Sequence, residues 1–266
     1  MGRIADAFAR AKAENRAALV IYLCAGDPDL ETTVDLVVAA ADAGADVVEL
    51  GVPFSDPTAD GPAIQRASER ALDGGTTLGK VLETVGAIRK RSDVPLLLFG
   101  YYNPLLSYGE SRVVEDAARR GADGFLVVNL PPEESDGLRL PAIEAGLDFV
   151  PLIAPTSESD RVGGAAKAAT SFLYYVSMTG VTGSQASDLQ AASERAASLQ
   201  TELGLPVAIG FGIKSREDAA TVARHADGVV VGTAVVRAIE TSESRAGAIE
   251  AVRALVSDLA SGVIRQ

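Results

Sequence analysis

The strongest constraint on the fold is a short pattern that recurs before apolar runs. It appears as Gly44-Ala45-Asp46, Gly121-Ala122-Asp123, Gly146-Leu147-Asp148 and His225-Ala226-Asp227. Because glycine adopts a left-handed conformation just past a helix at no steric cost, the pattern indicates the end of a helix. The short, β-branched run that follows indicates a strand buried on both faces. The repeating unit is therefore a strand and a helix.

Counting such runs along the chain predicts eight strands. They are Ala18–Cys24, Asp46–Leu50, Pro95–Tyr101, Gly124–Val128, Asp148–Ile153, Phe172–Ser177, Pro206–Gly210 and Gly228–Gly232. Helical spacing fills stretches between them, as in Leu30–Ala43, Leu78–Arg89 and Gln185–Leu203. Eight such units fit a closed (β/α)8 TIM barrel, an α/β fold of about 250 residues. An open doubly wound sheet also explains the alternation, but it gives no reason for the count to stop at eight.

The chain is expected to form a single domain, because no linker rich in Ser, Gly or Pro divides it. This domain spans residues 1–266, with the barrel at 18–258. Ile4, Phe8 and Ala11 recur at helical spacing, so an extra helix is predicted within residues 1–16. Its expected place is the N-terminal mouth of the barrel.

Composition excludes several classes of protein. Apolar residues make up 47% of the chain, enough for a full core. A net charge of -12 gives no basic surface for nucleic acid or anionic lipid. The longest apolar run, Ala18 to Ala25, is too short to span a membrane, and the N-terminus lacks a signal-peptide pattern. The single Cys24 is expected in the core, and the protein is predicted to be cytoplasmic.

Two carboxyl groups are the main candidates for chemistry. Loops after the strands of a TIM barrel build its active site. Glu49 lies at the end of the second predicted strand, and Asp60 lies in the long loop that follows. A glutamate in an apolar strand is costly to ionise unless it is paired, so it is either one half of a structural ion pair or a proton donor or acceptor. The catalytic position and the length of the loop favour the second interpretation.

Glycine-rich connections after the last three strands predict a phosphate site. These are Thr179–Gly183, Gly210–Lys214 and Gly232–Ala234. Glycine lets the backbone approach an anion, and many TIM barrels bind phosphate after strands seven and eight. Simple turn chemistry is the alternative interpretation. Three such loops at neighbouring strand ends favour a phosphorylated metabolite.

Other chemistries lack the residues that they need. His225 is the only histidine and is expected at the opposite end of the barrel, which argues against a His-ligated metal centre and a Ser-His-Asp triad. Lys214 is the only lysine in a predicted site loop, and it lies beside the phosphate rather than in a desolvated pocket for a Schiff base. The dinucleotide fingerprint is also missing. No metal is therefore expected, and acid-base chemistry by carboxyl groups remains.

The long second loop resembles the signature of the tryptophan synthase alpha chain family. The matching residues are Glu49-Leu50-Gly51-Val52-Pro53-Phe54-Ser55-Asp56-Pro57 and Ala59-Asp60-Gly61-Pro62. Shorter motifs extend the likeness over nearly the whole chain: Gly26-Asp27-Pro28, Tyr101-Tyr102-Asn103-Pro104, Tyr174-Tyr175-Val176-Ser177, Gly180-Val181-Thr182-Gly183 and Gly210-Phe211-Gly212-Ile213.

The resemblance implies cleavage of indole-3-glycerol phosphate into indole and glyceraldehyde 3-phosphate. It further implies that a pyridoxal-phosphate beta chain receives the indole in an alpha-beta-beta-alpha heterotetramer, and that this chain itself holds no cofactor. Glu49 is then the principal acid-base group, and Asp60 hydrogen-bonds the indole N–H, with Tyr174 or Tyr175 in support. The reaction needs a proton at ring carbon C3, stabilisation of the ring N–H and removal of a hydroxyl proton. The sequence leaves open which carboxyl group moves which proton.

The resemblance also implies three further sets of residues. Those expected to surround the indole ring are Tyr22, Leu98, Tyr101, Val127 and Phe211. Those expected to bind phosphate are Gly183, Gly212, Ile213, Gly232 and Thr233. Those expected to contact the beta chain are Pro53, Asp56, Pro57 and Thr58.

The chain departs from the family pattern at a few positions. The family commonly has phenylalanine at Tyr22, leucine at Thr58 and serine at Thr233. Thr233 keeps a hydroxyl group and an N–H, so phosphate binding is expected to survive, whereas Thr58 alters the surface offered to the beta chain. The segment Ser184-Gln185-Ala186-Ser187 departs from the arginine often found there, which predicts a different closure of that loop.

Three other functions compete with this interpretation. A stand-alone lyase that releases free indole would share every catalytic residue. A non-catalytic allosteric barrel subunit would not need Glu49, Asp60 and the phosphate loops. A sugar-phosphate isomerase or epimerase on the same scaffold is disfavoured because metal-binding histidines are missing.

Overall fold

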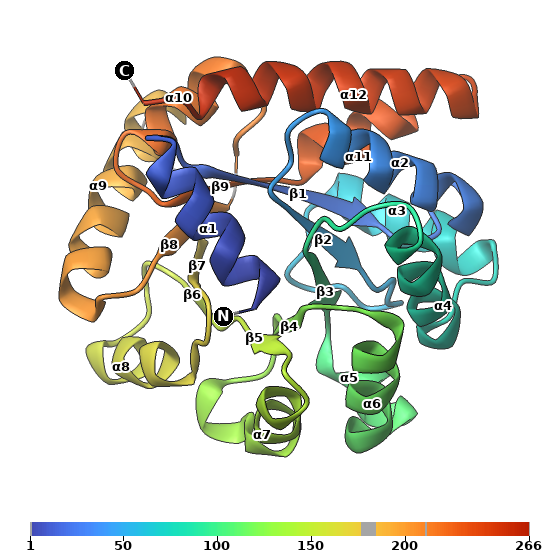
Figure 1. The fold of residues 1–266 in the computed structure, drawn as a ribbon, viewed down its shortest axis with the longest axis horizontal. Helices are drawn as coiled ribbons and strands as arrows, with labels where there is room; N and C mark the ends of the chain where they lie inside the picture. The colour runs from blue at the N-terminus through green and yellow to red at the C-terminus, as the bar shows by residue number, and fades with distance from the viewer. Residues whose placement is uncertain (1, 177–184, 211, 266) are drawn as a thin grey trace.

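Parallel strands form a curled sheet at the centre of the molecule (Figure 1). The computed structural model describes residues 2–176, 185–210 and 212–265. Within these ranges the strands are β1 (Ala18–Cys24), β2 (Val47–Gly51), β3 (Leu96–Gly100), β4 (Gly124–Val127), β5 (Asp148–Phe149), β6 (Leu152–Ile153), β7 (Leu173–Val176), β8 (Val207–Gly210) and β9 (Gly228–Val231). All neighbouring strands pair in parallel, in the order β5-β4-β3-β2-β1-β9-β8-β7-β6.

The described strands number nine rather than eight because the fifth predicted strand divides in two. β5 pairs with β4, whereas β6 pairs with β7. Val150 and Pro151 join the two pieces, and they continue the bonding: Val150 N donates to Phe125 O at 2.9 Å, and Tyr174 N donates to Pro151 O at 3.1 Å. The sheet therefore closes on itself here, and the predicted barrel is confirmed.

Side chains alternate between the inside of the barrel and its outer surface. Val20, Val47 and Leu97 belong to the inner apolar cluster. Their neighbours Leu19 and Val48 belong to the larger cluster beneath the helices. Since both faces are buried, the strands read as continuous apolar runs.

Helices surround the sheet on its outer side (Figure 1). The outer helices are α2 (Leu30–Asp42), α4 (Leu78–Arg89), α6 (Glu110–Arg120), α7 (Asp136–Glu144), α8 (Ser159–Ala168), α9 (Gln185–Leu203), α10 (Arg216–Ala223) and α12 (Arg245–Gly262). Further helical segments are α1 (Arg3–Ala13), α3 (Pro62–Asp73), α5 (Tyr102–Tyr108), η1 (Pro132–Glu134) and α11 (Thr233–Glu240). Among the described residues, no helix combines the length and apolar character needed to cross a membrane.

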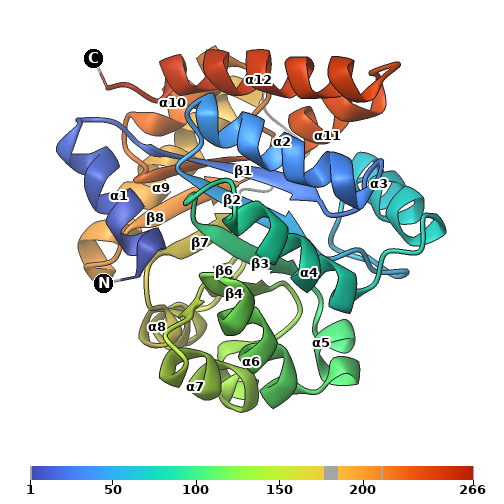
Figure 2. The ribbon, with the colours of Figure 1, turned by 45° about the vertical axis from the view of Figure 1, so that its right-hand side comes forward.

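The predicted N-terminal helix is α1, which seals one end of the barrel (Figure 2). Ile4, Ala7, Phe8 and Ala11 are buried and join the inner cluster. The ring of Phe8 stacks on Phe172 with centroids 4.7 Å apart. In Figure 2, α3 lies on the side of the sheet away from α1, so β2 runs from the α1 end toward the loop that carries Asp60.

The glycines of the repeated tripeptides end helices, as predicted. The aspartates that follow them have an additional role. Gly44 and Gly121 have φ of +113° and +89°, the left-handed region that glycine favours. Asp46 Oδ2 accepts a hydrogen bond from Leu19 N at 2.9 Å, and Asp123 Oδ2 accepts one from Leu96 N at 2.8 Å. Each aspartate therefore ties the start of its own strand to the neighbouring strand.

Candidate active site

Glu49 is placed by β2 inside the barrel, near its catalytic end. Its register partner on β1 is Tyr22. The side chain is only 1% exposed, and its Oε1 atom is fully buried with no hydrogen-bond partner. Burial raises the pKa of Glu49 to about 8, because ionisation in this apolar interior lacks compensation. This pKa favours the protonated form of Glu49 at neutral pH, and among the described residues none forms an ion pair with its carboxyl group.

Asp60 lies in the loop between β2 and α3, where Tyr101 holds the chain. The Tyr101 hydroxyl accepts a hydrogen bond from Ala59 N at 2.9 Å and also bonds the Asp60 carboxyl group. The Phe54 ring lies 5.3 Å from the Tyr101 ring, centroid to centroid. Burial raises the pKa of Asp60 to about 6, and the hydrogen bond from Tyr101 opposes that rise. Asp60 is therefore mostly ionised at pH 7, unlike Glu49.

Two tyrosines fill the interior near these carboxyl groups. Burial raises the pKa of the Tyr22 and Tyr174 phenols well above its usual range, and the nearby Glu49 and Asp60 add to the rise. Each hydroxyl lies against a glycine. A Cβ at Gly51 would clash with the Tyr22 hydroxyl oxygen, and one at Gly210 would clash with that of Tyr174. Only glycine leaves room for the phenols at these positions.

The structure corrects three of the predicted positions. Leu98, Val127 and Tyr175 belong to the cluster between the sheet and the outer helices, so they face away from the barrel interior. Alternation along each strand brings Phe99, Val128 and Tyr174 inward instead. Of the predicted tyrosine pair, Tyr174 is therefore the one near Glu49.

Sequence reasoning missed Phe99 and Val128 because their strands are apolar throughout, so no polar residue sets the phase of the alternation. The pairing of β3 with β2 would have identified Phe99 as an inward residue. Glu49 pairs with Leu97, which fixes the inward phase of β3. The edge of the Phe99 ring meets Tyr22, with centroids 5.2 Å apart at 78°.

The candidate phosphate site centres on the N-terminus of α11. Gly232 and Thr233 open this helix directly after β9, no side chain caps it, and its first turn carries no acidic residue. Its free N–H groups and the helix dipole favour an anion. By contrast, Ser215 caps α10, and Lys214 N donates to Asp218 Oδ2 at 3.1 Å.

The remaining candidates for phosphate binding differ in how exposed they are. Gly212 has φ +77° and is exposed. The Ile213 side chain is buried in the outer core, which leaves only its backbone for a ligand. Gly183 and the pocket candidate Phe211 lie outside the described residues.

The candidate partner surface lies on the loop between β2 and α3, which also carries Asp60. Asp56 and Thr58 are exposed, Pro57 is half-buried and Pro53 is buried. The Ser55 hydroxyl donates to Asp56 Oδ2 at 2.6 Å. Contact with another protein would therefore involve residues 56–58 more directly than Pro53.

The described residues of the site do not form a metal centre. Within the described ranges, no three His, Cys, Asp or Glu side chains are grouped so that they could hold a metal ion. His225 is exposed just beyond α10. The chemical groups offered by this face are carboxyl groups, phenols and helix N–H groups.

The fold and the site together define a class: a TIM-barrel enzyme with a buried and a half-buried carboxyl group of different proton occupancy at one end of its barrel. The family model of the tryptophan synthase alpha chain matches residues 8–263. The chain therefore belongs to the tryptophan synthase alpha chain family, and it is a lyase subunit of tryptophan biosynthesis.

Individual relatives agree over the full length. The chain is 46% identical over 265 residues to the tryptophan synthase alpha chain of Citrifermentans bemidjiense, covering 100% of this chain and 99% of the relative. It is 47% identical to that of a Geobacter species, with the same coverage. The crystal structure of the Legionella pneumophila alpha chain superposes with a TM-score of 0.90 at 38% identity, covering 99% of this chain and 97% of that one. A tryptophan synthase structure from M. tuberculosis also gives 0.90, at 35% identity with 100% of each chain covered.

Proposed function

We propose that Glu49 and Asp60 carry the reaction of the tryptophan synthase alpha chain family, cleavage of indole-3-glycerol phosphate into indole and glyceraldehyde 3-phosphate. The observation that carries this assignment is the buried, unpartnered Oε1 atom of Glu49. A buried polar atom without a partner is costly, and it is usually retained for a ligand or for chemistry. The raised pKa of about 8 supplies a proton donor at neutral pH.

Glu49 both gives and recovers a proton in this scheme. Its protonated carboxyl group delivers a proton to ring carbon C3, which leaves a positive iminium on the ring. The bond between C3 and the side chain then breaks, and its electron pair restores the aromatic ring. The side-chain hydroxyl loses its proton to the Glu49 carboxylate as the carbonyl of glyceraldehyde 3-phosphate forms. Glu49 thus ends the cycle protonated, as it began.

Asp60 stabilises the charge that appears on the ring. A carboxylate with a pKa of about 6 is mostly ionised at pH 7 and can accept the indole N–H. That hydrogen bond strengthens as the ring nitrogen becomes positive, so it favours the transition state over the ground state. Tyr101 holds Asp60 in place through the loop.

The rest of the substrate is held by the barrel wall and by α11. Tyr22, Phe99, Val128 and Tyr174 provide a largely apolar wall for the indole ring, and the N-terminus of α11 at Gly232 and Thr233 binds the phosphate. Residues 1–266 act as one domain in this account.

A partner receives the indole. The family name implies a beta chain, and the exposed Asp56 and Thr58 beside the site support contact at this loop. The assembly proposed is an alpha-beta-beta-alpha heterotetramer in the cytoplasm, in which the beta chain holds pyridoxal phosphate and makes tryptophan. This chain needs no cofactor for the cleavage itself.

The test is indole release from indole-3-glycerol phosphate by the purified chain, alone and with a tryptophan synthase beta chain. Slow release that rises sharply with the beta chain supports the proposal. Fast release that does not depend on a partner would favour a stand-alone lyase, and no release under either condition would contradict the assigned reaction.

A further inference from the structure

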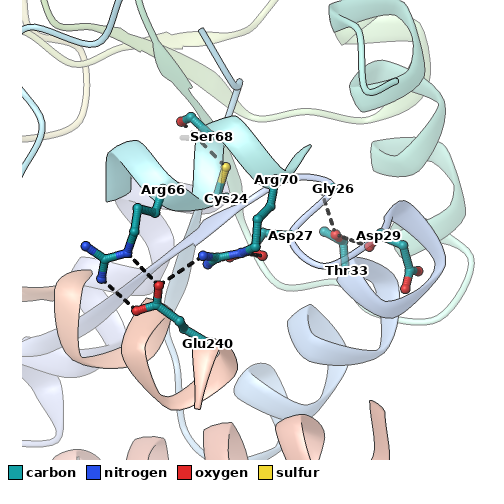
Figure 3. A network of polar contacts seen from close by, with 9 residues as sticks. All are labelled: Cys24, Gly26, Asp27, Asp29, Thr33, Arg66, Ser68, Arg70 and Glu240. Carbon is teal, nitrogen blue, oxygen red and sulfur yellow. Dashed lines mark hydrogen bonds and ion pairs between the residues drawn. The ribbon is translucent and has the colours of Figure 1, made fainter. Parts of the chain in front are cut away.

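A chain of ion pairs joins α3, α11 and the loop after β1 (Figure 3). Arg70 binds both oxygens of Asp27, through Nε at 2.8 Å and Nη2 at 2.9 Å. Its Nη1 donates to Glu240 Oε1 at 3.0 Å. Arg66 binds both oxygens of Glu240, at 2.7 and 2.8 Å. Two cations and two anions from three elements thus form one neutral network.

The elements that this network joins are those that hold the two ends of the substrate in the proposed function. Arg66 and Arg70 lie on α3, which begins two residues after Asp60, and Gln65 Nε2 on α3 donates to Asp60 O at 2.8 Å. Glu240 ends α11, whose first residue is Thr233. α3 therefore holds the loop residue Asp60 for the indole end, and α11 carries the N–H groups for the phosphate end.

The buried side chains that α3 contributes beneath the network are all small. The cluster between β1, α3 and α11 contains Tyr22 and Cys24 from β1 and Val236 from α11, with Ile64 and Phe99 packed against it, and α3 adds the alanines Ala63, Ala67 and Ala71. Alanines present few projections that interlock, so polar contacts fix how the helices sit. Asp27, only 2% exposed, anchors Arg70 from the loop after β1.

We propose that the Arg70–Glu240 pair is a positioning device for the cleavage reaction, which fixes Asp60 relative to the phosphate site. This inference rests on the proposed function. The side chains of Arg70 and Glu240 are 35% and 24% exposed, and ion pairs with that much contact with water add little to stability. Misplacement by about 1 Å can nevertheless cost about a hundredfold in rate. The contribution of the pair is therefore to the rate.

The variant Glu240→Gln tests this, because it removes the charge that both arginines bind and leaves the Arg70–Asp27 pair intact. We expect kcat/KM to fall about tenfold, as a displacement of less than 1 Å would cause. A matched control is Asp35→Asn. Asp35 also bridges two arginines from other elements, Arg91 and Arg245, at 2.6 Å each, and its side chain is 20% exposed, but it lies on the outer helices. The control should match Glu240→Gln in thermal stability and keep wild-type activity.

A double-mutant cycle separates positioning from general structural support. If the pair acts through Asp60, Glu240→Gln should cause no further loss of rate in an Asp60→Asn background. Additive losses would overturn the proposal, as would a Glu240→Gln variant no slower than Asp35→Asn. A wild-type chain that fails to cleave indole-3-glycerol phosphate would overturn the proposed function and this inference together.

Discussion

At the scale of single residues, the chemistry depends on how the surroundings of two carboxyl groups shift their pKa values. Glu49 is enclosed within the barrel with its Oε1 atom unpartnered, and burial raises its pKa to about 8. Asp60 is less deeply enclosed and is bonded by Tyr101, which limits its pKa to about 6. Because the two pKa values straddle neutral pH, one group is ready to give a proton while the other is ready to accept a hydrogen bond.

Replacing Glu49 with glutamine should stop the reaction and stabilise the protein. Glutamine cannot give a proton, so kcat should fall by about a hundred- to ten-thousandfold. The pKa of Glu49 rises from 4.5 in the unfolded chain to about 8, so between these pH values the unfolded state binds fewer protons and native stability falls as pH rises.

Glutamine does not ionise, so the variant does not lose stability in this way as the pH rises. We expect Glu49→Gln to raise the free energy of unfolding at pH 8 by about 1 kcal/mol or more, and to give no such gain at pH 4. Urea denaturation at the two pH values measures the difference. An equal effect at both would show that the Glu49 side chain is not buried as a neutral acid.

At the scale of elements, the loop between β2 and α3 is held by one side chain. The Tyr101 hydroxyl at the end of β3 bonds Ala59 N and Asp60, while its ring meets Phe54. The sequence shows this loop to be long and rich in carboxyl groups, but it gives no indication that a residue more than forty positions away would hold it.

Removing that hydroxyl in Tyr101→Phe should lower kcat/KM about tenfold, the value of one hydrogen bond to a charged group. The substitution should also raise the pKa of Asp60 further, because the hydrogen bond from Tyr101 lowers that pKa. The acid limb of the rate profile should therefore move to higher pH. Tyr108→Phe is the control, since the Tyr108 hydroxyl bonds Asp116 at 2.6 Å on α6. An unchanged acid limb in Tyr101→Phe would contradict this role for the loop.

Helices were predictable where the sequence contains a capping residue that marks their first turn. Asp29 accepts a hydrogen bond from Thr32 N and starts α2, and the predicted helix at residues 78–89 matches α4, which Thr77 caps. Side-chain direction was less predictable. Leu98 and Val127 were assigned to the pocket, but they face the helices because an all-apolar strand does not reveal which face is inside. Long-range ion pairs such as Arg70 with Asp27 leave no sequence pattern at all.

At the scale of the whole molecule, the two ends of the barrel have separate roles. α1 and the aspartates of the repeated pattern close one end: Arg3 pairs with Asp123 at 3.0 Å, and Arg10 pairs with Asp46 at 3.5 Å. The opposite end carries Glu49, Asp60 and the start of α11. The count of strand-helix units was enough to predict this architecture, but not the division of the fifth strand at Val150 and Pro151.

A substitution at the closed end should affect stability alone. Phe8→Ala removes a buried ring that stacks on Phe172, and it should lower the free energy of unfolding by about 3 kcal/mol. Because the ring lies at the end of the barrel away from Glu49, kcat at a temperature well below the melting point should stay at the wild-type value. A loss of kcat larger than the loss of folded protein would show that the two ends are coupled.

The most direct measurement of the central claim is the pH dependence of kcat/KM for indole-3-glycerol phosphate cleavage by the whole chain, because it reports the free enzyme. Activity should fall below about pH 6, as Asp60 takes up a proton, and above about pH 8, as Glu49 loses one. In Asp60→Asn the slower residual reaction should lose the acid limb and keep the basic one. A profile that stays flat from pH 5 to pH 9, or a basic limb that survives in Glu49→Gln, would contradict the account.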